Sequence, residues 1–188
     1  MKLILGFATF ALSTTGWSAD IVYLQSPEQM GVSVQALSKE AFEGEVDGYA
    51  KAASLKSGPS GDFEIRIWRV DSMTGQGIGY VLSDNQTRTF DITRHNDEYS
   101  ARLTSSRSHA FSEALTAAAR DVSSLGGNEY SCGIVDGESV LVEASIEGSR
   151  HQLWAGNPQS CADKNSRRIA TLLRLVDAEA NRSERPET

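Results

Sequence analysis

The chain has few prolines and no long apolar run beyond its N-terminus. It contains four prolines among 188 residues, which excludes a proline-rich scaffold. Apolar residues after position 12 are interrupted throughout, so a protein with several membrane-spanning helices is also excluded. Acidic residues outnumber basic ones, with 25 Asp and Glu against 18 Lys and Arg. A surface of that sign repels phosphate backbones, and we therefore expect no nucleic-acid partner.

The overall composition is that of an ordinary folded protein. Hydrophobic residues make up 39% of the chain and charged residues 23%, which argues against wholesale disorder and against collagen-like or coiled-coil architecture. The length predicts one compact domain or at most two small ones.

Residues 1–19 have the pattern of a secretory signal peptide. Lys2 supplies a positive charge, residues 3–12 are mostly apolar, and small and polar residues follow to Ala19. Ten such residues are too few to span a bilayer but match the hydrophobic region of a signal. We predict cleavage within one residue of Ala19 and a periplasmic or secreted mature protein without a membrane span. An uncleaved interfacial anchor is the alternative.

Both cysteines, Cys132 and Cys161, lie in the predicted mature chain. An even number in an exported protein favours one structural disulfide, because extracytoplasmic compartments are oxidising. A reactive thiol, the alternative, is typical of a basic neighbourhood or a Cys-x-x-Cys pair, and this sequence has no such pair. We predict a Cys132–Cys161 disulfide that stabilises the fold by roughly 3–4 kcal/mol.

The start of the mature chain gives no consistent pattern. Residues 26–29 are typical of a capped helix start, whereas residues 30–34 alternate as in a strand. Residues 44–61 are rich in Gly, Ser and Lys and predict a loop with one turn of helix near its middle. We treat 20–62 as an N-terminal segment and loop, and 183–188 as a disordered tail.

Residues 63–182 predict an α+β domain, an antiparallel β-meander sheet with two helices packed on one face. Strands are followed by a helix twice, which is compatible with two strands-then-helix units. Asp136-Gly137 is typical of a two-residue hairpin turn between the strands on either side of it. The predicted strands are 63–67, 80–82, 87–93, 99–103, 130–135, 140–146 and 151–154; the predicted helices run from near Ser108 to 125 and from between Asp163 and Ser166 to about 181.

The last helix and the strand at 140–146 are expected to pack together. Apolar residues repeat along each at the spacing that places them on one side, and the two surfaces are close in sequence. These residues are Ile169, Leu172, Leu173, Val176 and Ala180 in the helix, and Val140, Val142, Ala144 and Ile146 in the strand.

Catalytic and cofactor motifs are weak. The glycines at 75, 77 and 79 resemble a phosphate-binding loop, but a strand rather than a helix follows them, so we predict a hairpin. The three histidines are far apart in sequence, and no Gly-x-Ser-x-Gly elbow is present. His95 is expected in an exposed turn, His109 at a helix cap and His151 on a surface strand. We predict no cofactor and no metal site.

One strand face suggests an interface. Trp68 lies on the face opposite Ile65 and Ile67, beside Arg66. An exposed tryptophan next to an arginine is typical of an interaction anchor, so Trp68 and Arg66 are the candidate binding residues. The alternative is that a helix or the N-terminal segment covers this face.

These observations favour an exported soluble envelope protein that acts by binding another macromolecule, as an inhibitor, an immunity-type protein or an accessory protein. A protein partner is expected, and an enzyme is the less favoured class. The first alternative is an envelope hydrolase whose carboxylates come together only in the fold. A subunit that assembles through an open sheet edge is the second.

Overall fold

The computed structural model describes residues 39–125, 129–131 and 137–182. The predictions for the signal peptide, for residues 20–38, for Cys132 and for the tail 183–188 lie outside these ranges.

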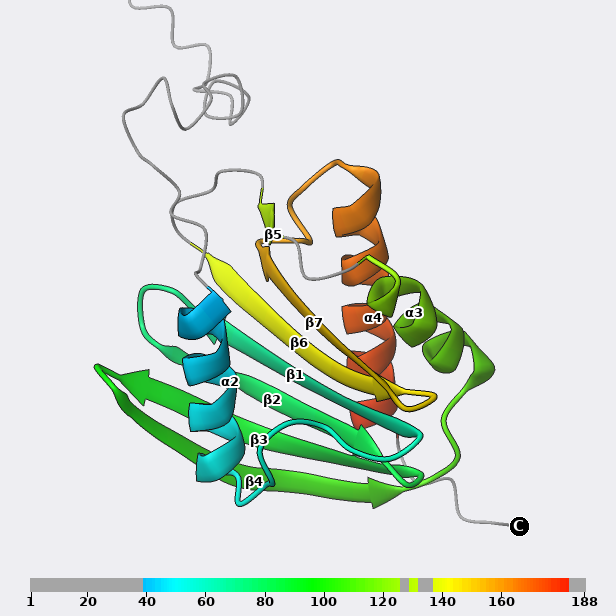
Figure 1. The fold of residues 1–188 in the computed structure, drawn as a ribbon, viewed down its shortest axis with the longest axis horizontal. Helices are drawn as coiled ribbons and strands as arrows, with labels where there is room; N and C mark the ends of the chain where they lie inside the picture. The colour runs from blue at the N-terminus through cyan, green and yellow to red at the C-terminus, as the bar shows by residue number, and fades with distance from the viewer. Residues whose placement is uncertain (1–38, 126–128, 132–136, 183–188) are drawn as a thin grey trace, which may run out of the picture. The chain divides into compact units, whose positions relative to one another are not determined.

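The described residues form an α+β fold on one open sheet, as predicted (Figure 1). Six antiparallel strands lie in the order β4-β3-β2-β1-β6-β7, and β5 extends the sheet beside β7 in the parallel direction. The elements are α2 Lys39–Ala52, β1 Phe63–Asp71, β2 Gln76–Ser83, β3 Gln86–His95, β4 Glu98–Ser108, α3 Glu113–Ser123, β5 Glu129–Ser131, β6 Glu138–Ile146, β7 Ser149–Gly156 and α4 Lys164–Ala180.

The first four strands form the predicted meander. Each pairs with the next in sequence, and β4 ends the sheet as an edge strand whose side chains are mostly exposed. Asp84 and Asn85 both have positive φ in the β2–β3 turn, as a tight hairpin of this twist requires. The register between β3 and β4 shifts at Thr89/Phe90, where a bulge interrupts the pairing.

The 75–79 glycines belong to the β1–β2 hairpin, as predicted. Gly75 has a φ of +66° at the turn, and Gly77 and Gly79 continue into β2. A Cβ at Gly77 would lie 1.9 Å from the Arg69 carbonyl oxygen, and one at Gly79 would lie 2.5 Å from the Trp68 ring. The motif therefore permits close packing within the sheet.

The predicted hairpin at Asp136-Gly137 is wrong in its pairing. β5 pairs with β7, and both neighbours of β6 are other strands, namely β1 and β7. The tight turn in this region is Glu147-Gly148, where both residues have positive φ and join β6 to β7. Gly137 instead packs against Asn157, whose side-chain oxygen would lie 1.8 Å from a Cβ at that position.

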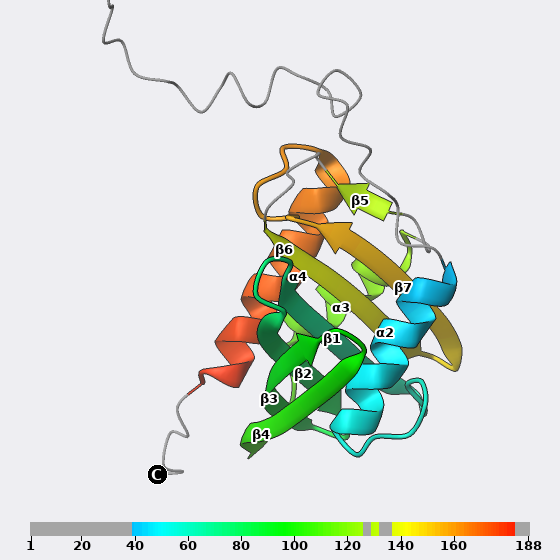
Figure 2. The same cartoon turned by 90° about the vertical axis from the view of Figure 1, so that its left-hand side faces the viewer.

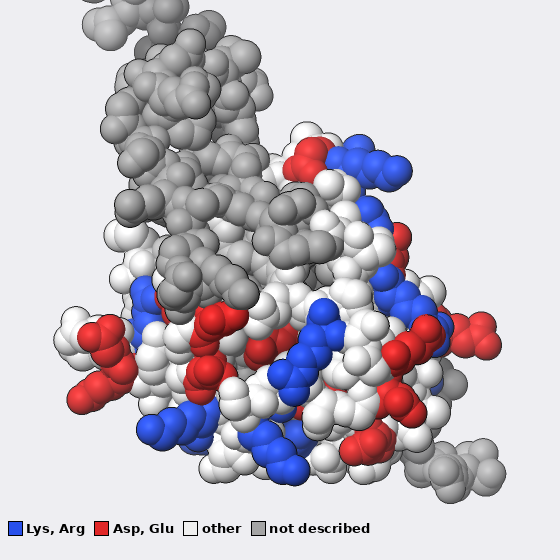
Figure 3. Space-filling view, viewed as in Figure 1, with Lys and Arg blue, Asp and Glu red and all other residues white. Residues whose placement is uncertain are grey.

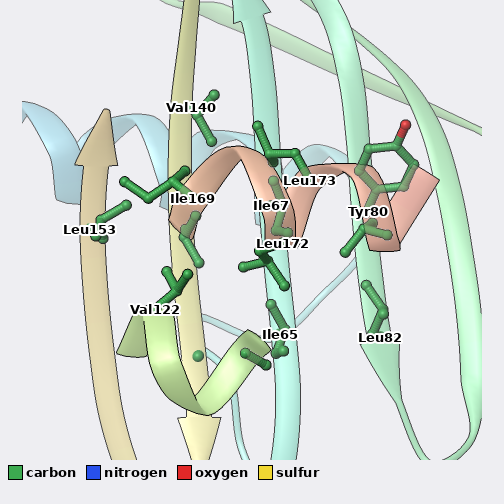
Figure 4. Packing of buried hydrophobic residues seen from close by; sticks show 14 of the residues in the cluster. Ile65, Ile67, Tyr80, Leu82, Val122, Val140, Leu153, Ile169, Leu172 and Leu173 are labelled. Atoms are coloured by element: carbon green, nitrogen blue, oxygen red, sulfur yellow. The ribbon is translucent and has the colours of Figure 1, made fainter. Parts of the chain in front are cut away.

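Helices α3 and α4 cover one face of the sheet, which confirms the predicted packing (Figures 1 and 4). The stripe of α4 and the alternating residues of β6 belong to one buried cluster with Ile65, Ile67 and Leu82. Asp163 caps α4 by accepting hydrogen bonds from the Asn165 and Ser166 amides, each at 2.9 Å.

Helix α3 begins later than predicted. β4 continues to Ser108, and Ser112 is the N-cap, with its side chain accepting from the Leu115 amide at 3.3 Å. The predicted capping role of His109 is therefore wrong. Its Nε2 lies 2.9 Å from an oxygen of Glu179, which places His109 between the end of β4 and α4.

Helix α2 packs on the opposite face of the sheet (Figure 2). The loop predicted for 44–61 is wrong over its first part, because the helix runs through Ala52. Phe42, Val46 and Tyr49 form its buried stripe at helical spacing. Gly44 and Gly48 weaken helix propensity and conceal the element in the sequence. Gly48 has a packing reason, since a Cβ there would lie 2.6 Å from the Tyr99 ring.

Candidate functional site

The two predicted binding residues lie inside the molecule. Trp68 is 0% exposed and stacks on Tyr49 of α2, with ring centroids 5.5 Å apart. Arg66 is 2% exposed. Neither side chain is available as a surface anchor. The predicted face is correct, but the alternative of a covering helix is what the structure contains.

Arg66 belongs to a buried polar layer between β1 and α2. Its Nε donates to Glu64 at 2.8 Å, and its Nη1 donates to the Lys56 carbonyl at 2.7 Å. Glu64 also accepts from the Ser60 amide at 2.9 Å. These bonds tie the loop after α2 to the centre of the sheet and compensate both buried charges.

A pocket of about 320 Å³ opens beside this layer, between α2, the loop after it, and strands β6 and β7. We call it the Glu143 pocket. It is lined by Glu43, Val46, Asp47, residues 57–59, Glu143 and residues 150–152.

Glu143 is the buried group of this pocket. It lies on β6 between Arg66 of β1 and Gln152 of β7 in the sheet register, and it is 2% exposed. Its Oε2 is buried and has no hydrogen-bond partner within the described part of the chain. A buried carboxyl oxygen without a donor is costly, so such atoms are rare and often functional.

The electrostatics of Glu143 reflect its position. Burial raises the pKa of this carboxyl above its ordinary value. The cations Arg66 and Arg150 and a side-chain hydrogen bond from Gln152 to this carboxyl oppose the rise, and the Asp47 carboxylate adds to it. The side chain is therefore poised to accept a proton or a positively charged donor.

The rim of the pocket carries charges of both signs. Asp47 of α2 is exposed and accepts a hydrogen bond from the Ser57 hydroxyl at 2.8 Å. Arg150 of β7 lies against Gly58, where a Cβ would be 3.0 Å from the guanidinium. Acidic and basic side chains alternate over the surrounding face, without a basic stripe among the residues drawn (Figure 3).

Sequence reasoning did not single out Glu143. The signal that could have found it is a set of charged residues, Glu64, Arg66 and Glu143, on the faces of two strands whose other faces are apolar. Two larger hollows, near Phe111 and near Ile78, are lined by none of the buried side-chain atoms that lack a partner.

A second polar cluster serves as a structural tie. Arg69 donates to Glu138 at 2.7 Å and to Asp177 at 3.0 Å, and the Tyr80 hydroxyl donates to Asp177 at 2.6 Å. Burial raises the pKa of Tyr80, and Asp177 acts in the same direction. This network joins α4 to three strands.

The other histidines considered in the sequence, His95 and His151, lie near the surface. His95 is exposed at a hairpin turn, as expected, and His151 is half-buried at the Glu143 pocket. Within the described ranges, no three His, Cys, Asp or Glu side chains gather as a metal site requires. The helices in these same ranges are all too short or too polar to cross a membrane.

Comparison with known proteins does not assign the chain to a family. No protein-family model matches the chain, and no curated protein matches it either.

Proposed function

We propose that this chain is an exported soluble protein of the cell envelope that binds another macromolecule through the Glu143 pocket. The observation that carries the proposal is that Glu143 lines a surface pocket, while its buried Oε2 has no hydrogen-bond partner among the described residues. Binding would supply that donor and remove the cost of the unsatisfied group. An inhibitor, an immunity-type protein or an accessory protein would act in this way.

The size of the pocket favours a protein partner. At about 320 Å³ it is at the lower limit of pockets for free small molecules, and it suits one inserted side chain. A single anchor side chain in a desolvated pocket supplies a large share of the binding energy in many protein complexes. The polar rim then surrounds the anchor, as at other interfaces.

The net charge is compatible with this reading. Removal of residues 1–19 removes one lysine and no acid, which leaves 17 basic against 25 acidic residues. Such a surface attracts a basic partner and speeds its association at low salt.

Site-specific crosslinking tests the proposal. A photoreactive residue at the exposed rim position Ser57 should capture a partner in the organism that makes the protein, whereas one at Arg174 on the opposite face should not. The captured protein is then purified, and its Kd for the mature chain is measured. Glu143→Gln should weaken that binding at least tenfold, while the exposed-site control Glu98→Gln should not. Unchanged binding to Glu143→Gln rejects the pocket as the recognition site.

A hydrolase is the second candidate, since one observation favours it. A buried carboxyl with a raised pKa and a second carboxylate, Asp47, at the same pocket is the arrangement of a general acid with its partner. Hydrolysis of a panel of aryl glycosides, abolished by Glu143→Gln and retained by Glu98→Gln, would support it. A binding role requires only a donor that reaches Glu143, whereas hydrolysis also requires a second carboxylate in a catalytic position. We therefore prefer the binding role.

A further inference from the structure

We infer that the Glu143 pocket receives a positively charged ammonium group, such as the end of a lysine side chain of the partner. This inference rests on the proposed function, since it names the chemistry of the group that the same pocket binds.

The first argument is the placement of carboxyl groups. Glu43 and Asp47 are one helical turn apart, so they lie on the same side of α2. Both line the pocket together with Glu143 of β6. Two acidic residues of the lining thus come from the helix and one from the sheet, and Arg150 and His151 are its basic residues. Asp47 and Glu143 alone outnumber Arg150, so the lining is negative when these two carboxyl groups are ionised and His151 is neutral.

The second argument is that the nearest internal cation is already engaged. Arg66 is adjacent to Glu143 in the sheet, but its Nε donates to Glu64 and its Nη1 to the Lys56 carbonyl. Turning it toward Glu143 would leave Glu64 buried with its charge uncompensated, which is strongly unfavourable. No hydrogen bond joins Arg66 to Glu143 Oε2 among the described residues, so the missing donor is assigned to a bound group.

The third argument concerns the shape of the donor. An ammonium group is compact and carries three donors that can point to different acceptors, whereas a guanidinium is a planar fork suited to one carboxylate. The acceptors here belong to two different elements, α2 and β6. A pocket of about 320 Å³ also accommodates the apolar stem of a lysine.

The experiment uses three small probes with the mature protein. These are N-α-acetyl-lysine N-methylamide, its uncharged analogue with norleucine, and the anionic analogue with glutamate. Binding is followed by NMR through the backbone amides of Glu143 and Gln152. The lysine probe should bind saturably, and at least tenfold more tightly than the norleucine probe. Glu143→Gln should weaken it at least tenfold, as should Asp47→Asn, while Glu98→Gln should not.

Equal affinity for the lysine and norleucine probes would overturn the inference, because the site would then recognise only the stem. Tighter binding of the glutamate probe would also overturn it and would make Arg150 the recognition group. Measurements with the crosslinked partner distinguish a failure of the ammonium inference from a failure of the proposed function. If its binding depends on Glu143 but the lysine probe does not compete with it, the pocket is the site and the ammonium assignment is wrong. Failure of both the probe and the Glu143 dependence rejects both proposals.

Discussion

Glu143 makes the stability of the protein depend on pH in a defined direction. Its carboxyl is buried between β1 and β7, with Arg66, Asp47 and Arg150 as the charged neighbours from the surrounding elements. Burial raises its pKa above the ordinary value of 4.5, so the folded protein holds the proton more tightly than the unfolded chain does. The stability from this group is fully present below the unfolded pKa and is lost as pH rises through the folded pKa.

The variant Glu143→Gln should remove this dependence, because an amide of the same shape does not ionise. We expect the free energy of unfolding of the wild type, measured relative to the variant, to fall between pH 4 and pH 8. Urea melts at these two values measure it. Glu98→Gln, at the exposed start of β4, is the control and should follow the wild type. A constant difference between wild type and Glu143→Gln would show that Glu143 does not titrate as its burial implies.

At the residue scale, the sequence correctly predicted on which face of the sheet a side chain lies, but not whether that face is exposed to solvent. Alternation correctly placed Trp68 opposite Ile65, since side chains in a strand change sides at every residue. Whether a face is covered depends on an element elsewhere in the chain. Here that element is α2, which covers Trp68 and makes it a core residue. The candidate site is instead Glu143, which belongs to no recognisable sequence motif.

The pairing of α4 with the sheet is the strongest prediction at the scale of elements. Leu172 is buried against the central strands, whereas Arg174, two residues later, is exposed. Leu172→Ala should lower the free energy of unfolding by about 2–5 kcal/mol, because it leaves a cavity in a packed core. Arg174→Ala should cost less than about 1 kcal/mol. Denaturant melts compare the two, and comparable losses would mean that the wrong side of α4 has been assigned to the core.

Elements with strong periodicity were predictable, and those without it were not. The meander, β6, β7 and α4 all have regular apolar spacing. The predicted bounds of β3, β6, β7 and α4 lie within two residues of the observed ones, whereas β1, β2 and β4 each extend four or five residues further at one end. Helix α2 was missed because two glycines interrupt its pattern, one of which exists to fit the Tyr99 ring. The place of β5 was missed because strand neighbours depend on which edge is free. Since β6 is flanked by β1 and β7, β5 pairs with the outer side of β7.

A disulfide between Cys132 and Cys161 would join the chain after β5 to the loop between β7 and α4. Ser131, which precedes Cys132, pairs with Gly156 in the β5–β7 ladder. Cys161 is buried, and its Sγ lies 3.7 Å from the Gly156 carbonyl oxygen; Cys132 lies outside the described residues, so the bridge stays a prediction. Non-reducing peptide mapping should recover the two residues joined, and Cys132→Ser should cost about 2–4 kcal/mol. Two free thiols in protein purified from an oxidising compartment would refute the bridge.

Export of the whole molecule is tested by mass. If the N-terminal pattern is a signal peptide, the protein in the envelope or medium should begin at Ala19 or Asp20. Intact-mass spectrometry of that fraction measures it. A species that retains Met1 through Trp17 would instead support the uncleaved anchor.

The bulge in the outermost strand has a consequence for deuterium uptake. Only alternate residues of an edge strand direct their N–H groups toward its neighbour, so amides along β4 should alternate between slow and fast exchange. The register shift inserts Thr104, since Leu103 pairs with Phe90 but Ser105 pairs with Thr89. The alternation must therefore reverse its phase at Thr104: slowly exchanging amides should be two residues apart on either side of it, but an odd number apart across it.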